Sequence, residues 1–273
     1  MKRNYVPYEL TLMLFLSLAL FISCNKDDDD DNPVANAFAI GSSNNLLSFN
    51  ISSPNKIIND KPITGLQVGE VILAIDMRPA TNQLYGLGSI SRLYMIDKTT
   101  AVATVVGTAA FTPALSGATF GFDFNPLVDR IRVISNTRQS FRLNPETGAV
   151  AGSDTDLSPG SPTVSAVAYN NNAAGGTSTT LYAIDPSTDK LYLVGGIGGA
   201  PSPNLGVLTE VGALGINVDG NNGFDISGTD KAYALLTVGS ATKLYTINLT
   251  TGAATAVGDF TGPVKGLAVA PGL

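Results

Sequence analysis

The sequence has no histidine, no tryptophan and only one cysteine among its 273 residues. Without histidine there is no imidazole to act as the base of a Ser-His-Asp triad or to bind zinc in the usual way. One cysteine can form neither an internal disulfide nor a thiolate cluster. Charged residues are also few, at 14%, and a net charge of -6 argues against a nucleic-acid-binding surface.

The N-terminus has the features of a bacterial lipoprotein signal peptide. Lys2 and Arg3 give it a positive start, and residues 10–22 form an apolar run. That run is shorter than the ~20 apolar residues that a membrane-spanning helix needs, and it suits a signal peptide. The FISC sequence at 21–24 resembles a lipobox, in which the cysteine becomes the lipidated first residue after cleavage. We therefore expect lipid attachment at Cys24.

An acidic segment follows the cysteine, with aspartate at every position from 27 to 31. Such a run is a solvated spacer rather than part of a core, and it resembles the export signal of surface lipoproteins in the Bacteroidetes lineage. We expect a signal peptide over residues 1–23, a tether over 24–35 and one folded domain over 36–273. The expected location is the cell envelope, anchored by lipid in the outer membrane and exposed at the surface.

An apolar pattern ending in Asp or Asn recurs along the rest of the chain. Its copies end at positions 50, 97, 144, 185 and 248, which are 47, 47, 41 and 63 residues apart. The clearest copies are LYMID, FRLN, LYAID and LYTIN. Most copies are followed by a turn and a second alternating run, as in PETGAVAG at 145–152, which is typical of a β-hairpin.

A second motif lies before each hairpin and reads as a short buried strand. Its copies are LAIDMRP at 73–79, FGFDFNP at 120–126, VSAVAYN at 164–170, GFDISG at 223–228 and GLAVAP at 266–271. The two motifs together give four strands in about 47 residues, as in a blade of a β-propeller. The 29 glycines suit a fold with many tight turns.

The two ends of the domain predict how many blades there are. AFAIGS at 37–42 resembles a second strand without a first, and GLAVAP resembles a first strand without a blade to follow. Joined, they complete one blade and close a ring of five, so we predict an all-β propeller of five four-stranded blades. A six-bladed ring is the alternative, because LYAID at 181–185 fits either the second or the third strand of its blade.

The block FGFDFNPLVDRIRVISNTRQSFRLNPETGAV, together with LYAIDPSTD, LYTINLTTGAATAVG and GLAVAP, carries a family resemblance. It resembles the secreted and lipid-anchored bacterial proteins grouped as domain of unknown function 4394, over about residues 36–271. The resemblance implies no activity, substrate or catalytic residue.

Three of the five inner strands carry an acid at the matching position, namely Asp76, Asp123 and Asp225. We expect three separate acids at strand ends, each accepting hydrogen bonds from backbone N–H groups. The first alternative is a ligand or cation site in the central channel, with calcium as the cation considered. The second is a glycan hydrolase or lyase in which two of the acids act as acid and base.

Arginines concentrate in one predicted blade, where Arg130 and Arg132 could contact an anion. The alternative is that these arginines pair with acids such as Asp129 or Glu146. A further calcium loop at 217–225 is disfavoured because its glycine comes one place late.

The composition and motifs favour a non-catalytic binding module over the hydrolase or lyase alternative. We expect no resident cofactor apart from the calcium considered above. The expected partners are a membrane, reached through the lipid, and a protein, polymer or small ligand. The sequence predicts a monomer without nucleic-acid partners.

Overall fold

Alternating apolar residues form β-strands from Ala37 to Val269 in the computed structural model, which describes residues 1–3, 34–228 and 230–273. The predicted signal peptide and Cys24 fall outside the described residues, apart from residues 1–3. The strands are β1 (Ala37–Gly41), β2 (Asn45–Asn50), β3 (Ser53–Pro62), β4 (Ile72–Arg78), β5 (Gln83–Gly88), β6 (Arg92–Ile96), β7 (Ala103–Val106), β8 (Phe120–Asn125), β9 (Arg130–Ser135), β10 (Ser140–Leu143), β11 (Val150–Ser153), β12 (Ala166–Tyr169), β13 (Leu181–Asp185), β14 (Lys190–Val194), β15 (Leu208–Ala213), β16 (Gly223–Ile226), β17 (Ala232–Val238), β18 (Ala241–Ile247), β19 (Ala254–Asp259) and β20 (Val264–Val269).

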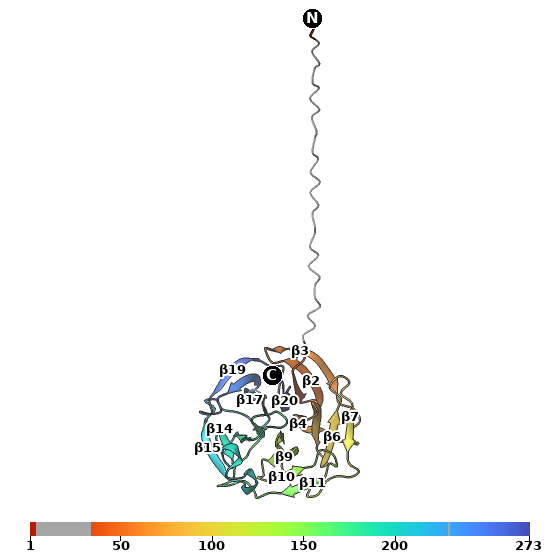
Figure 1. Cartoon of the computed structure of the whole chain (residues 1–273). Helices are drawn as coiled ribbons and strands as arrows, with labels where there is room; N and C mark the ends of the chain where they lie inside the picture. The colour runs from red at the N-terminus through yellow and green to blue at the C-terminus, as the bar shows by residue number, and fades with distance from the viewer. Residues whose placement is uncertain (4–33, 229) are drawn as a thin grey trace. The chain divides into compact units, whose positions relative to one another are not determined.

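The strands form five antiparallel sheets of four, arranged as the blades of a propeller (Figure 1). From the inner strand outward, blade 1 is β20-β1-β2-β3, blade 2 is β4-β5-β6-β7 and blade 3 is β8-β9-β10-β11. Blade 4 is β12-β13-β14-β15 and blade 5 is β16-β17-β18-β19. The prediction of a five-bladed all-β propeller is confirmed, and the six-bladed alternative is wrong.

Blade 1 closes the ring with strands from both ends of the domain. β1 pairs antiparallel with β20, with Ala37 opposite Val269 and Phe38 opposite Ala268. The C-terminal strand therefore provides the inner strand of the blade whose other three strands come first in the chain. This closure agrees with the pairing predicted from the two half-blades.

The Asp or Asn that ends each copy of the repeat has a structural role in four blades, and in blade 1 the side chain of Asn50 accepts the N–H of Ser52 at 3.0 Å. The side chain of Asp97 accepts the N–H groups of Thr99 and Thr100, at 2.9 and 2.7 Å. Asn144 and Asn248 make the same kind of turn, each accepting the N–H two residues on. These turns connect the third strand of a blade to its fourth, which explains why the residue recurs.

Blade 4 departs from this pattern, because its copy of the repeat forms the second strand of the blade and not the third. LYAID forms β13, and Asp185 bonds to the N–H of Ser187 in the turn before β14. The connection from the third to the fourth strand instead contains two short 3-10 helices, η1 (Ile197–Gly199) and η2 (Pro203–Leu205). Because the copy ending at 185 lies one strand earlier in its blade than the other copies, the interval before it is short, at 41 residues, and the interval after it is long, at 63.

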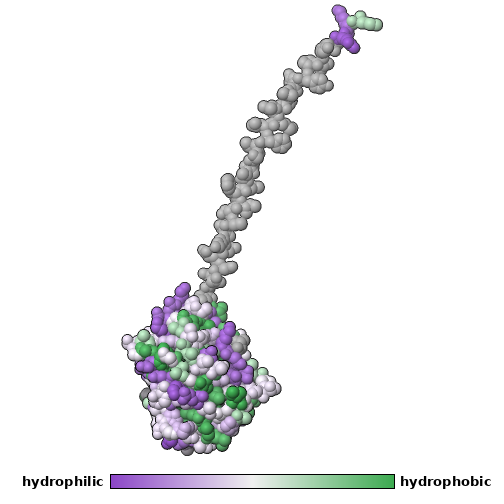
Figure 2. Space-filling view, turned by 90° about the vertical axis from the view of Figure 1, so that its left-hand side faces the viewer, coloured by the Kyte–Doolittle hydropathy of each residue, from purple (hydrophilic) through white to green (hydrophobic). Residues whose placement is uncertain are grey.

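Apolar side chains pack mainly between the blades rather than around one central core. Each of five buried clusters joins a pair of adjacent blades, so that the clusters follow one another around the ring. On the side that carries the outer strands β14, β15 and β19, hydrophilic and hydrophobic residues alternate over the surface (Figure 2). Within the described part of the chain, no helix is long and apolar enough to cross a membrane.

Candidate functional site

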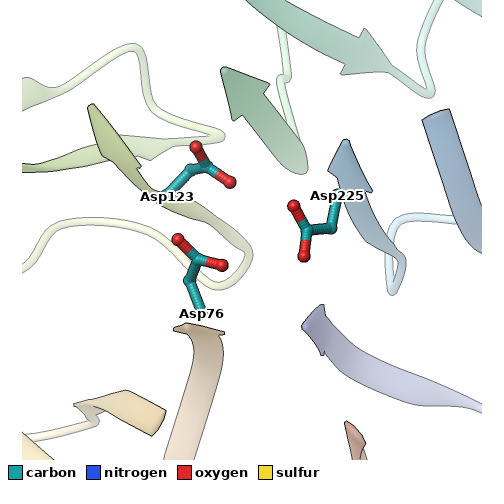
Figure 3. A group of neighbouring side chains, drawn as sticks. All are labelled: Asp76, Asp123 and Asp225. Atoms are coloured by element: carbon teal, nitrogen blue, oxygen red, sulfur yellow. The ribbon is translucent and has the colours of Figure 1, made fainter. Parts of the chain in front are cut away.

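The three predicted acids meet in the central channel. Asp76 lies on β4, Asp123 on β8 and Asp225 on β16, and each is at most 1% exposed. One carboxylate oxygen from each lies within 4.8 Å of the others. Figure 3 shows the three side chains pointing toward a shared space. We call these residues the acid triad, and the expectation that they would be separate is wrong.

Small residues on the inner strands explain why the acids come so close. A Cβ at Gly121, two residues before Asp123, would lie 2.8 Å from the backbone nitrogen of Val167 on the next inner strand. At Gly223, two residues before Asp225, the corresponding distance to the nitrogen of Leu267 is 2.5 Å. Only glycine fits such an approach, so the inner strands pack tightly and the channel is narrow.

Each acid accepts a hydrogen bond from the inner strand of the following blade, as expected for acids that fix blade-to-blade geometry. The bonds of this kind run from Phe124 N–H to Asp76 Oδ2 (2.7 Å), from Tyr169 N–H to Asp123 Oδ1 (2.9 Å) and from Val269 N–H to Asp225 Oδ2 (2.5 Å). The expectation of backbone donors is therefore confirmed. These bonds join blades 2, 3 and 5 to their neighbours.

One oxygen of the acid triad has no partner. Asp76 and Asp225 each also accept the N–H of the next residue, Met77 and Ile226, both at 2.6 Å. Five backbone donors thus face six carboxylate oxygens. The oxygen left over is Asp123 Oδ2, which is buried and makes no hydrogen bond to any residue that the structure describes.

Burial and mutual repulsion make the triad hard to ionise completely. Loss of solvation raises the pKa of all three carboxyls, and that of Asp225 reaches about 7. The charge of Asp225 raises the pKa of Asp76 further, and the charges of Asp76 and Asp225 do the same for Asp123. The backbone donors oppose the shift but do not cancel it. The triad therefore attracts positive charge, either as protons or as a cation.

The predicted arginines lie in blade 3, where a buried carboxylate joins two of its basic residues. Arg132 is 1% exposed and pairs with Asp154. It also donates to Asn204 Oδ1, in η2 of blade 4, at 2.6 Å. Arg142 binds the same Asp154 carboxylate at 2.9 Å. Sequence reasoning missed Asp154 and Asn204, because neither lies in a repeated motif.

Asp129 and Glu146, the acids expected as alternative partners of these arginines, pair with another arginine. Asp129 and Glu146 both pair with Arg78 of blade 2, each at 2.5 Å. Arg130 donates instead to the backbone carbonyl of Asp129, at 2.8 Å. Among the described residues, Arg130 therefore has no carboxylate partner.

A pocket of about 280 Å³ lies where blades 3 and 4 meet, and we call it the arginine pocket. Its lining includes Arg130, Arg132 and Arg142, together with Leu127 and Val128, which are 37% and 56% exposed. The opposite wall comes from blade 4 and includes residues of η1 and η2. Three guanidinium groups gather here with one neighbouring carboxylate, that of Asp154.

The disfavoured calcium loop at 217–225 is divided by the fold. Asp225 turns into the central channel, while the backbone carbonyl of Asp219 accepts the side-chain amide of Asn222 at 2.7 Å. Asp225, the last residue of this segment, thus belongs to the central channel.

A five-bladed propeller with an acid triad at its axis and an arginine pocket between two blades is the class of protein that these observations define. The chain belongs to the family described as a domain of unknown function, DUF4394, whose model matches residues 45–268. The resemblance noted from the sequence is thereby confirmed. No curated protein matches the chain.

Solved structures give more distant matches. PorZ of Porphyromonas gingivalis, a bacterial surface component of the type-IX secretion system, is 15% identical with a TM-score of 0.40. The Dos1 propeller is 14% identical with a TM-score of 0.43. A protein of unknown function from Bacteroides thetaiotaomicron is 13% identical with a TM-score of 0.49. These matches cover 81%, 82% and 84% of this chain but only 26%, 58% and 60% of the other chains.

Proposed function

We propose that this protein is a lipid-anchored, non-catalytic binding module of the bacterial cell envelope that holds an anionic ligand in the arginine pocket. The observation that carries this proposal is the excess of guanidinium groups there. Asp154 is shared by Arg132 and Arg142, and among the described residues Arg130 bonds only to backbone carbonyls. Three positive charges against one negative charge leave two uncompensated, in a chain whose net charge is -6.

The pocket is also built to hold its arginines in place. Arg132 donates to Asp154, Asn204, Ser140 and Tyr169, so its guanidinium is fixed between blades 3 and 4. Fixed donors lose little conformational entropy when they bind a carboxylate, sulfate or phosphate. Arg142 is 31% exposed and Arg130 is partly exposed, so both can reach a ligand.

The apolar part of the pocket narrows the class of ligand. Leu127 and Val128 are exposed beside the guanidinium groups, and a volume of about 280 Å³ suits a ligand of roughly monosaccharide size. A small acidic ligand with an apolar face, such as an acidic sugar unit, combines both features. The same pocket could receive the end of a longer surface polymer.

The geometry favours binding over the hydrolase or lyase alternative. Five of the six oxygens of the acid triad already accept backbone N–H groups, and the side chains are at most 1% exposed. The pocket at the channel mouth is only about 50 Å³, far below the 300–1,000 Å³ of typical ligand sites. A sugar unit does not fit this pocket, and the acids themselves are buried.

Binding can be tested by thermal melts and calorimetry with the purified full chain. The probes are glucuronate, inorganic sulfate and inorganic phosphate, compared with neutral glucose. We expect at least one anion to bind, and the Arg130→Gln variant to lose at least tenfold in affinity. Arg138→Gln, which removes the same charge from the same blade outside the pocket, should bind like the parent. The proposal fails if no anion binds or if both variants bind equally.

The envelope location is supported by the lipobox-like FISC at 21–24 and the aspartates at 27–31. Replacing Cys24 by Ser should release the protein or leave its precursor unprocessed. Cell fractionation with metabolic lipid labelling measures this. A Cys24→Ser protein that fractionates and labels like the parent would contradict the anchor.

A further inference from the structure

The acid triad presents a mismatch that the fold itself creates. Each of the five blades turns one N–H group toward the acids, while three carboxylates supply six oxygens. The unpaired Asp123 Oδ2 belongs to a buried side chain whose carboxylate is directed into the space shared with Asp76 and Asp225 (Figure 3). A buried oxygen without a donor destabilises the fold unless a positive group meets it.

We propose that Asp76, Asp123 and Asp225 bind a calcium ion on the axis of the propeller. The donor set consists of oxygen alone, and the sequence contains no histidine, so a hard divalent cation fits better than zinc. Calcium binds oxygen at 2.3–2.6 Å, which places oxygens on opposite sides of the ion about 4.6–5.2 Å apart. The triad oxygens all lie within 4.8 Å of one another, close enough for one such ion to contact all three carboxylates.

Magnesium fits the same oxygens less well. Its bonds of 2.0–2.1 Å allow opposite ligands only about 4.2 Å apart, and it demands near-octahedral geometry. Backbone bonds between blades hold the triad carboxylates in place, so they cannot rearrange freely into the near-octahedral geometry that magnesium demands. Calcium tolerates irregular coordination and can complete its shell with carboxylate oxygens in bidentate mode or with water.

A small pocket lies on the axis at one end of the channel. A pocket of about 50 Å³ is lined by residues at or near the start of all five inner strands, which are Leu73, Phe120, Ser165, Asn222 and Lys265. Asp123 lies three residues further along β8 than Phe120, or roughly 10 Å at 3.3 Å per residue. The side-chain oxygen of Asn222 is buried without a partner beside this pocket and offers an intermediate ligand.

A bound ion would tie three blades together across the channel. Asp76 and Asp123 belong to the adjacent blades 2 and 3, and Asp225 belongs to blade 5 on the other side of the axis. The ion would thus stabilise the closed ring independently of the arginine pocket. Failure of the anion-binding proposal would leave this one unaffected.

The test uses the purified full chain after treatment with EDTA, at pH 7.5. Thermal melts and calorimetry are run with calcium chloride, with magnesium chloride and with neither. The variants are Asp123→Asn in the triad and Asp185→Asn as the control, because Asp185 is another buried acid that accepts backbone and hydroxyl donors, outside the channel.

We expect calcium at a hundredfold excess over its dissociation constant to raise the parent's melting temperature by several degrees, with magnesium giving a smaller shift. Asp123→Asn should weaken calcium binding at least tenfold, whereas Asp185→Asn should keep the calcium shift even if it lowers the melting temperature. A parent that melts alike in EDTA and calcium would show that protons, not a cation, occupy the triad. An Asp123→Asn variant that still binds calcium like the parent would also overturn the proposal.

Discussion

The acid triad and the arginine pocket gather buried charge in opposite ways. In the channel, six carboxylate oxygens face five backbone donors, so acceptors are in excess. In the pocket, two of three guanidinium groups share the carboxylate of Asp154 and the third, that of Arg130, bonds to backbone carbonyls, so donors are in excess. The comparison teaches that the hydrogen-bonding groups left without a partner, more than the charges themselves, indicate what the channel and the pocket can bind. The excess acceptor in the channel favours a cation, and the excess donors in the pocket favour an anion.

The largest expected loss of stability comes from breaking the buried ion pair between Arg132 and Asp154. Asp154→Ala leaves the guanidinium of Arg132, 1% exposed, without its carboxylate. An unpaired buried charge typically costs about 3–5 kcal/mol, so we expect a loss of that size in the free energy of unfolding, measured by urea denaturation.

The control for this change is Asp259→Ala, which removes the exposed partner of Lys243. Exposed ion pairs contribute little, so this variant should unfold like the parent. If Asp154→Ala also unfolded like the parent, the buried pairing described for blade 3 would be wrong.

A smaller effect should separate two acids of the triad. In EDTA, Asp225→Asn should lower the free energy of unfolding by about 1–3 kcal/mol. Both oxygens of Asp225 accept backbone N–H groups, whereas the asparagine amide has only one oxygen and leaves one of these N–H groups without an acceptor. Asp123→Asn should be neutral or stabilising, because its amide nitrogen can take the place of the unpaired Oδ2 and donate to a neighbouring acid.

Urea denaturation of both variants under identical conditions makes the comparison. Equal losses of unfolding free energy for Asp123→Asn and Asp225→Asn would mean that the balance of donors and acceptors does not determine the stability of the channel. A larger loss for Asp123→Asn would reverse the account.

A further effect, spread over several pH units, is the dependence of stability on pH. The pKa of each triad carboxyl is raised in the folded protein, to about 7 for Asp225, so the native state holds protons that the unfolded chain has released. Their contribution is full below the unfolded value of about 4 and is lost as the pH rises through the folded value. The groups whose charge raises these pKa values are the triad acids themselves.

In EDTA, the parent should therefore become less stable between pH 5 and pH 8, at up to about 1.4 kcal/mol per pH unit for each proton released. Asp123→Asn should flatten this slope, since it removes one of the carboxyls whose pKa is raised. Urea denaturation at four pH values measures it, and a parent whose stability rises over this range would contradict the pKa directions.

Much of the fold could be predicted because each blade repeats the same local signals. The turn residues Asp97, Asn144 and Asn248 recur for a physical reason, and the half-blades at the two ends predict the closure of β1 on β20. Blade 4 was harder, because Asp185 forms a similar turn one strand earlier.

The candidate sites could be predicted only in part. The matching positions of Asp76, Asp123 and Asp225 followed from the repeat, but their convergence depends on the channel width that Gly121 and Gly223 permit. Pairing of Arg132 with Asp154 and Asn204 depends on side-chain contacts between elements far apart in the sequence. A single sequence carries no local signal for such contacts.

The most direct test of the central claim is a high-resolution crystal structure of the protein grown with calcium. The account predicts a calcium ion on the propeller axis with one oxygen of Asp76, Asp123 and Asp225 each about 2.3–2.6 Å away. Carboxylate oxygens of the triad that instead contact one another at about 2.5–2.7 Å, with no ion between them, would show a shared proton and contradict the claim.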